Sequence, residues 1–441
     1  MTRVVLLDEQ RLERTTNCGR NAENRIEAPQ HVQRRTLAVL ASAQVLGLAG
    51  LAGGGTVGAL LGRDLLGGTT WAGLPQAFLV VGTAATAVPL SRYMAHAGRR
   101  PGLRLGWLLG AIGASLVVAA AVWSNPALLL TGMALIGSAA AAGDAAKYAA
   151  ADLALPAARG VAIGTVVSAS TVSAIAGPNL AAPTGSLARS LGMPELAGPF
   201  VLAVLTFGMA ALLLTLFLRP DPLMVARGLA LPAARARGPL PPNPLSALVR
   251  RPGVPLGLIA MSAANFVMIL VMTMAPIHLA AHHSNLNVVG LAVSAHIAGM
   301  FAISPLTGRL SDQLGRAPVI GLGGCGLMAA GALAAMAEPH DTALLILSLV
   351  ILGIGWNFGL IGGSALLTDS VPELARPRMQ GIADASAGIA GMVASVLSGL
   401  LLAAAGFAAL GLVAVVVAAG LAGVSLRWAT KPPVPASGEL S

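Results

Sequence analysis

Long apolar runs broken by short polar segments constrain this chain more than any other feature of its sequence. The segment from Gly308 to Pro318, GRLSDQLGRAP, is a polar island between two such runs. Each flanking run has about 20 residues, which is enough for a helix to cross a bilayer. The pattern therefore predicts a hairpin of two membrane spans, with Arg309, Asp312 and Arg316 at the membrane surface.

The composition also indicates a membrane protein. Hydrophobic residues make up 56% of the 441 residues and charged residues only 10%, with a mean hydropathy of +0.80. A soluble domain of this size carries far more charge. The net charge of +10 resides between apolar runs, so it predicts an orientation in the bilayer and no nucleic-acid partner. Cys18 and Cys325 lie far apart, so no disulfide framework is expected.

Twelve apolar spans are predicted, which makes the fold an all-α polytopic membrane protein. Their approximate centres are Leu48, Val80, Gly113, Gly137, Thr171, Thr206, Val267, Gly299, Gly326, Gly353, Val393 and Val415. With both termini in the cytosol, every Lys and Arg except Arg63 and Arg189 falls on the cytosolic side. This asymmetry follows the positive-inside rule and supports the span count and the orientation together.

Five segments follow from these spans: a disordered cytosolic tail (1–35), a six-helix half (36–218), a cytosolic linker rich in Pro and Arg (219–254), a second six-helix half (255–428) and a cytosolic tail (429–441). The two halves repeat. With one fixed offset, polar and turn-forming residues match in six pairs: Gly98 with Gly315, Arg99 with Arg316, Pro101 with Pro318, Gly106 with Gly323, Asp152 with Asp369 and Arg159 with Arg376. Such repeated halves are typical of transporters.

The spacing of Gly308, Asp312, Gly315 and Arg316 resembles the signature loop of the major facilitator superfamily. The first copy of that loop, residues 91–100, departs from the pattern, because Ser91 and Ala95 stand where Gly and Asp are usual. The resemblance extends over the chain after about residue 36 through the two six-span halves. It implies twelve transmembrane helices and secondary transport by alternating access.

Span 5 carries a second resemblance, to the small-residue pattern of antiporters and especially of drug exporters. Gly164, Gly177 and Pro178 fit that pattern, whereas Ser173 replaces a Gly. Small side chains allow close helix packing and a proline permits a kink. Ordinary packing in a Gly-rich membrane protein is the alternative.

Charged residues in the cytosolic loops are candidates for a gate. The pairs Arg99–Asp152 and Arg316–Asp369 occupy equivalent places in both halves, and Asp312 is expected near a helix N-terminus. In the family such cations bridge to neighbouring acids while the cytosolic side is closed. The alternative is that these ion pairs are permanent and only hold the loops in place.

Asp384 lies in span 11, where it could replace the acid missing at Ala95. We predict that it pairs with Arg92, Arg99 or Arg100 and bridges the halves.

Two further titratable residues lie inside spans and are candidates for proton coupling. Asp144 lies in span 4, and an acid at membrane depth is costly and therefore a functional candidate. Lys147 is three residues away, so a simple ion pair at the membrane interface is the alternative. His296 in span 8 titrates near neutral pH in water, and its alternative is a neutral packing residue. Met133 occupies the place of an Arg found in many proton-coupled exporters, which argues against coupling.

The superfamily lines its cavity with spans 1, 4, 7 and 10. The polar or aromatic residues expected there are Gln44, Asp144, Asn265, Trp356 and Asn357. Few of these are charged, so a neutral or lipophilic substrate is expected, or a cation if Asp144 faces the cavity. His278, His282 and His283 cluster without an acid or cysteine, so no metal site is predicted, and no cofactor is expected.

The sequence thus predicts a monomeric exporter of small amphiphilic or drug-like molecules in a bacterial plasma membrane, driven by protons. Two alternatives remain: a gradient-independent metabolite uniporter or importer, and a non-transporting membrane sensor or binding protein. An enzyme is not expected, because no nucleotide-binding loop or nucleophile arrangement is present.

Overall fold

The structure is a computed structural model that describes residues 30–51, 57–58, 60–67, 71, 73–228, 245–275, 278–279, 286–338 and 341–429. The described part is helical and contains no strand. Each of the twelve predicted span centres lies in a helix, so the predicted all-α membrane fold is confirmed. Ten of the described helices are long and apolar enough to cross a membrane; these ten do not include residues 30–51 or the helix at Arg159–Ser190.

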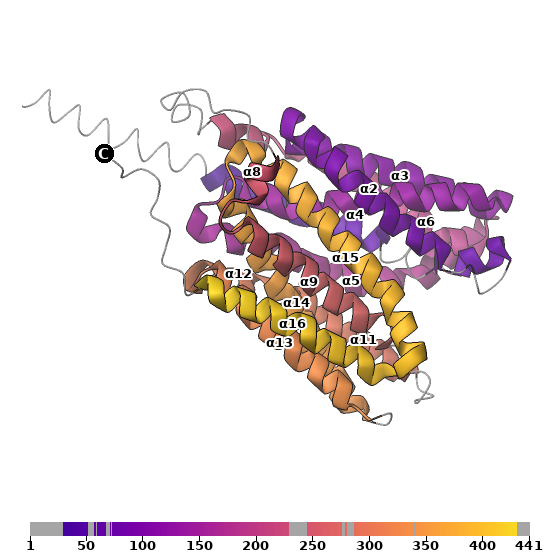
Figure 1. The fold of residues 1–441 in the computed structure, drawn as a ribbon. Coiled ribbons are helices and arrows are strands. Elements are labelled where there is room, and N and C mark those ends of the chain that lie inside the picture. The colour runs from indigo at the N-terminus through magenta and orange to yellow at the C-terminus, as the bar shows by residue number, and fades with distance from the viewer. Residues whose placement is uncertain are drawn as a thin grey trace, which may run out of the picture.

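The N-terminal half begins with helical residues 30–51. It continues through α2 (Leu74–Ala97), α3 (Arg99–Trp123), α4 (Pro126–Ala151), η2 (Pro156–Ala158), α5 (Arg159–Ser190), η3 (Glu195–Ala197) and α6 (Gly198–Phe217) (Figure 1). The C-terminal half comprises α8 (Leu245–Val249), α9 (Val254–Met272), α11 (Leu286–Phe301), α12 (Ser304–Leu314), α13 (Arg316–Met336), α14 (Thr342–Ser370), η4 (Glu373–Ala375), α15 (Arg376–Ala405) and α16 (Phe407–Ala429).

The helix boundaries reproduce the repeat seen in the sequence. Gly98 ends α2 at φ 101° and Gly315 ends α12 at φ 93°, in the left-handed region that favours glycine. Pro156 begins the short 3₁₀ turn after α4, and Pro372 precedes the equivalent turn after α14. The next helix of each half then starts at Arg159 or at Arg376, so equivalent cations lie at equivalent helix starts.

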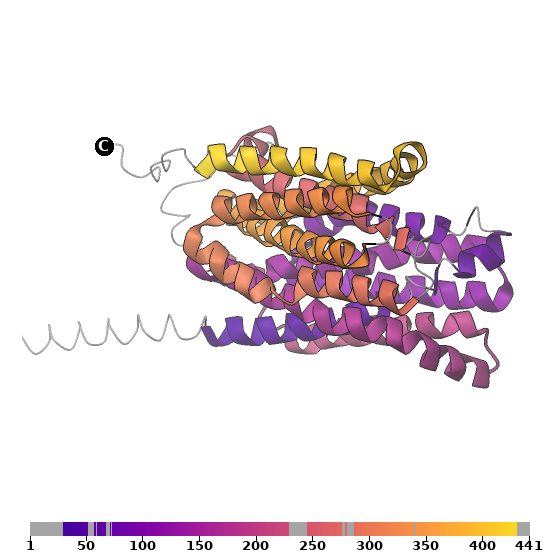
Figure 2. The same ribbon diagram turned by 90° about the horizontal axis from the view of Figure 1, so that it is seen from below.

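Each half has its own hydrophobic core. One buried cluster draws on residues from Val39 to Leu218 and a second on residues from Leu256 to Leu421. The two halves converge at one end of the molecule and diverge toward the other (Figure 1). The helix of residues 30–51 starts and α16 ends at the same end of the bundle, as Figure 2 shows. Two separately packed halves can rotate against each other without disrupting either core.

The halves approach most closely where glycines remove side chains from the contact. A Cβ atom on Gly160 at the start of α5 would lie 2.5 Å from the carbonyl oxygen of Gly308 in α12. Gly381 in α15 likewise faces Ser91 in α2, with no room for a Cβ atom. These contacts lie beside the loops predicted to be cytosolic. The halves therefore touch backbone to backbone on that side.

Candidate functional site

A cavity of about 260 Å³ lies between the halves. Its polar and aromatic lining comes from both of them: Gln44, Thr83, Asp144, Lys147, Ser170, Asn265, Phe301, Trp356 and Asp384. Four of the five predicted cavity residues line it, namely Gln44, Asp144, Asn265 and Trp356. One space shared by two halves is the arrangement that alternating access requires.

Asn357, the fifth residue predicted to line the cavity, is not among the residues that line it, so this prediction was wrong. Asn357 is fully buried, and its amide nitrogen donates to the carbonyl oxygen of Met300 at 2.6 Å and to Ser304 Oγ at 2.7 Å. Successive residues on a helix point about 100° apart, so Trp356 can face the cavity while Asn357 faces α11 and α12. The Asn357 side chain thereby ties α14 to the break between those two helices.

Asp144 points into the cavity. Its side chain is exposed, whereas its neighbours Gly143 and Ala145 on α4 are buried. Among the described residues it has no hydrogen bond and no ion pair within 4 Å, although it interacts electrostatically with Lys147 and Asp384. A carboxylate at this depth without a partner is free to bind a proton or a cation.

Lys147, one turn along α4, is paired across the halves rather than with Asp144. Its Nζ lies 2.8 Å from Oδ1 of Asp384 in α15, and the two side chains are 6% and 9% exposed. The Tyr148 hydroxyl donates to the same Asp384 oxygen at 3.0 Å. Asp384 therefore does bridge the halves, but its predicted partners were wrong. Arg99, one of them, binds Asp152 and Gln380 instead.

Two aromatic side chains, Phe301 and Trp356, line part of the cavity. The Trp356 indole donates to Asn265 Oδ1 at 3.3 Å, and Asn265 donates to the carbonyl oxygen of Ala387 at 2.8 Å. Phe301 packs edge-on against Trp356 with ring centroids 5.7 Å apart. These contacts hold the indole in one orientation, so an apolar or aromatic ligand would meet a prearranged surface.

Gln44 and His296 occupy different environments. The Gln44 amide nitrogen lies 3.4 Å from Ser170 Oγ and joins the first helix to α5 at the cavity wall. His296 lies away from the cavity, is 1% exposed, and places Nδ1 2.7 Å from the carbonyl oxygen of Leu349. Because a carbonyl only accepts, Nδ1 carries the proton. This position fits the packing alternative for His296.

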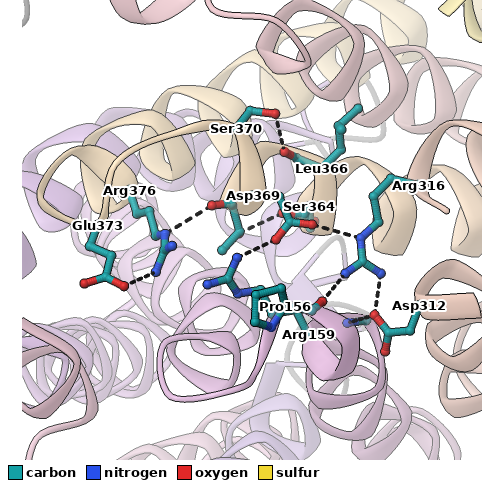
Figure 3. Close-up of polar contacts among 12 residues, drawn as sticks. Pro156, Arg159, Asp312, Arg316, Ser364, Leu366, Asp369, Ser370, Glu373 and Arg376 are labelled. Atoms are coloured by element: carbon teal, nitrogen blue, oxygen red, sulfur yellow. Dashed lines mark hydrogen bonds and ion pairs between the residues drawn. The ribbon is translucent and has the colours of Figure 1, made fainter. Parts of the chain in front are cut away.

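A polar cluster around Arg316 joins the halves on the side that the sequence predicts to be cytosolic (Figure 3). Arg316 Nε lies 3.0 Å from Asp369 Oδ2 and an Nη donates to the carbonyl oxygen of Pro156 in the other half, while the guanidinium also binds Asp312. Arg159 of the N-terminal half binds the second oxygen of Asp369 at 2.5 Å. The predicted Arg316–Asp369 pair is thus present within a larger network that spans both halves.

Asp312 lies at a helix N-terminus, as the sequence predicts. Its two oxygens accept hydrogen bonds of 2.9 Å from the backbone nitrogens of Gly160 and Val161, the first turn of α5. Those groups have no partner inside the helix, and the helix dipole favours an anion there. Asp312 therefore holds α12 of one half against α5 of the other.

The equivalent cluster around Arg99 is smaller and more deeply buried. Arg99 Nε lies 2.7 Å from Asp152 Oδ2, and both side chains are 1% exposed. One contact reaches the other half, a 2.6 Å hydrogen bond from Arg99 Nη2 to Gln380 Oε1. The predicted Arg99–Asp152 pair is present, and Gln380 completes it.

The antiporter-like residues of span 5 lie in α5. Gly164 packs against the backbone of Ser304, so the pattern begins at the contact between α5 and α12. Ser173 is buried and donates to the carbonyl oxygen of Val45 at 2.7 Å. Gly177 and Pro178 are helical, and their side-chain surroundings lie outside what the structure describes.

Three residues that take part in these polar contacts, Tyr148, Arg159 and Gln380, were not predicted as site residues. Tyr148 follows Lys147 directly, and Gln380 lies one turn before Asp384, so both positions were discoverable as polar neighbours of predicted sites. Arg159 was noted only as part of the repeat. His278, from the histidine cluster, stacks on Phe407 with centroids 4.4 Å apart, and residues 282 and 283 lie outside the described residues.

Two helical halves surround one cavity and meet at one end along a seam of polar contacts and buried apolar side chains, which is the architecture of a membrane transporter built on an internal repeat. The family model of the major facilitator superfamily matches residues 256–441. The chain is 38% identical over 381 residues to the uncharacterized MFS-type transporter YddS of Bacillus subtilis, covering 86% of this chain and 87% of that protein.

A second sequence relative and a solved structure are also transporters. The chain is 30% identical to the riboflavin transporter RfnT of Brucella anthropi, over 80% of this chain and 85% of that protein. The solved structure of the E. coli fucose:proton symporter matches with a TM-score of 0.70 at 15% identity, over 90% of this chain and 98% of the other. The chain belongs to the major facilitator superfamily and is a multi-pass membrane transporter.

Proposed function

We propose that this protein is a secondary active transporter that exports small amphiphilic molecules from a bacterial cell by antiport with protons, and that it resides in the plasma membrane. The observation that carries the proposal is Asp144, a carboxylate without a partner that faces a cavity shared by both halves. A carboxylate in a cavity that opens to each side of the membrane in turn can take up a proton on one side and release it on the other. Such proton transfer is the simplest basis for coupling export to protons.

The conformation fits one end state of this cycle. The contacts of α5 with α12 and α14 join the halves on the side that we assign to the cytosol, while the halves diverge toward the opposite end (Figure 1). We infer that this state faces outward, where Asp144 takes a proton from outside. Rotation of the halves would then break the cytosolic cluster and expose the cavity to the cell interior.

The cavity chemistry supports an amphiphilic substrate. Trp356, Phe301 and the Met261 and Met300 side chains supply an apolar, polarizable wall. Asp144 and Asp384 supply negative charge to the same cavity. A molecule with a planar apolar body and a cationic or hydrogen-bond-donating edge fits this combination.

A second candidate substrate follows from one relative. The 30% identity to a riboflavin transporter favours a planar heteroaromatic molecule of the riboflavin type, which the Trp356 wall would also accept. Transport of that substrate would agree with the alternative of a metabolite importer or uniporter.

The test uses inverted membrane vesicles that contain the protein and are energised by a pH gradient, acidic inside, with ethidium and riboflavin as separate probes. Antiport predicts ethidium uptake that a protonophore abolishes and that Asp144→Asn removes. Riboflavin uptake that ignores the gradient would establish the uniporter instead. Binding of either probe without any flux would favour a sensor.

A further inference from the structure

The strongest unexplained feature of the cavity is its arrangement of three charges. Two carboxylates, Asp144 and Asp384, line the same cavity. The positive charge of one lysine, Lys147, attracts both of them. In the present state Lys147 binds Asp384 at 2.8 Å, while Asp144 has no ion-pair partner. The described part of the cavity therefore holds one more carboxylate than cation.

The position of these residues makes the pairing conditional on conformation. Lys147 and Asp144 both belong to α4 of the N-terminal half, whereas Asp384 belongs to α15 of the other half. The Lys147–Asp384 bond thus spans the seam that opens when the cytosolic side opens. Tyr148, the second partner of Asp384, also lies on α4, so Asp384 loses both partners at once.

A buried ammonium ion without a partner is costly, so Lys147 needs a new partner in the opened state. Residues three apart on a helix lie on the same face, and Asp144 is three residues before Lys147. Asp144 also has no competing bond to break. Asp144 is the only acid of α4 among the cavity-lining residues, and it lies on the same helix as the lysine, so the rotation of the halves leaves it close to Lys147.

Resting on the proposed antiport, we propose that Lys147 moves between two carboxylates, Asp384 in the outward-facing state and Asp144 in the inward-facing state, and thereby expels the cation bound to each. A proton taken up by Asp144 from outside passes to cytosolic water when the ammonium group of Lys147 arrives. Lys147 stays protonated throughout, so the charges balance.

The same movement leaves Asp384 vacant in the inward-facing state. Asp384 is then the carboxylate that meets a cationic substrate from the cytosol. The return of Lys147 and Tyr148 to Asp384 displaces that substrate to the outside. Proton and substrate would therefore use different carboxylates, and the lysine would link their occupancies.

The test measures which carboxylate is free, using modification by dicyclohexylcarbodiimide, an apolar reagent for carboxylic acids, on the full-length protein in lipid nanodiscs. Mass spectrometry reports labelling at Asp144 and at Asp384. Wild-type protein held outward-facing is expected to label at Asp144 in preference to Asp384. Asp384→Asn releases Lys147 onto Asp144 and should reduce Asp144 labelling about tenfold, the effect of a modest charged interaction.

The decisive variant is the double substitution Asp384→Asn with Lys147→Met. Without the lysine, Asp144 should label again to within about threefold of the wild-type level. A purely structural role for Asp384 predicts no such recovery. Unchanged labelling in Asp384→Asn, or absence of recovery in the double variant, would overturn the proposal.

A second variant covers the case in which Asp384→Asn does not fold. Asp369→Asn weakens the cytosolic cluster without touching the three charges, so it should move labelling from Asp144 toward Asp384. Labelling that stays on Asp144, while cavity accessibility shows an opened cytosolic side, would also contradict the proposal. These readouts need no substrate. Failure of proton-driven transport with normal labelling would therefore reject the proposed function and leave the lysine exchange standing.

Discussion

The loop between α2 and α3 and the loop between α12 and α13 occupy equivalent places in the two halves, and their arginines pair with equivalent acids, yet the two clusters differ in exposure and in their contacts with the other half. Arg99 is sealed against Asp152 of its own half, with both side chains 1% exposed. Arg316 and Asp369 are 11% and 27% exposed and are joined by Arg159 from the other half. The first cluster therefore resembles a core contact and the second a surface contact between the halves.

The difference follows from one missing acid. The loop with Asp312 binds the N-terminus of α5 in the opposite half, whereas the equivalent position in the first loop is Ala95. The hydrogen bond from the first loop to the opposite half goes to the neutral Gln380, and Ser91 adds a close packing contact with Gly381. We infer that pairs within a half persist through the cycle, while contacts between halves break and re-form.

The largest expected effect is on stability, from Asp152→Asn. Removal of one partner of a fully buried ion pair leaves Arg99 uncompensated and should lower the free energy of unfolding by about 3–5 kcal/mol. Thermal unfolding in detergent measures this change. Asp369→Asn is the matched variant in the other repeat. Equal losses of stability in the two variants would show that the clusters do not differ.

Gly308→Ala should disturb the contact between halves more than either half itself. A methyl group there meets the backbone of Gly160 and costs the closed state about 1–3 kcal/mol. We expect faster labelling from the cytosolic side of a cysteine placed at Ala84 in the cavity, with Cys18 and Cys325 replaced by alanine. Gly208→Ala is the control, because nothing lies within 4 Å of its added atom.

Asp369→Asn should shift the same conformational balance by a smaller amount. It removes the negative charge shared by Arg159 and Arg316 and one of its two acceptor oxygens, which together are worth about 1–2 kcal/mol at this partly exposed site. Cytosolic labelling at position 84 should rise while the unfolding temperature changes little. Glu373→Gln is the control, since Glu373 pairs with Arg376 inside one half. A similar rise in the control would contradict the special role of Asp369.

Gln380→Leu should have the smallest effect. It removes one hydrogen bond between the halves, worth about 1 kcal/mol, while Arg99 keeps its bond to Asp152. Cavity labelling from the cytosolic side should rise slightly, below the increase for Asp369→Asn. A larger increase than that of Asp369→Asn would identify the Arg99 cluster as the main gate.

The sequence predicted the fold well because apolar runs, glycine turns and the repeat are all local signals. Gly98 and Gly315 end helices at equivalent places. The arginine that follows each glycine pairs with Asp152 or Asp369, the acids that the repeat had matched to each other. Cavity residues were predicted from their spans alone. That reasoning succeeded for Trp356 and failed for Asn357, because the angular position of a residue on an apolar helix has no sequence signal when all faces are apolar.

Partners between halves were harder to predict. Asp384 was expected to take an arginine from the first loop, but Lys147 lies closer across the seam between α4 and α15. Such contacts depend on how two separately packed halves meet, and no local pattern encodes that geometry. The unpaired state of Asp144 was likewise invisible in the sequence, since Lys147 at three residues suggested a local pair.

The most direct test of the central claim, proton exchange at Asp144, is proton flux in liposomes that contain the purified protein and a trapped pH dye. An outward gradient of ethidium is applied without any pH gradient. The account predicts internal acidification in the wild type, because protons enter as ethidium leaves, and none in Asp144→Asn. Ethidium efflux without acidification, or acidification that persists in Asp144→Asn, would contradict it.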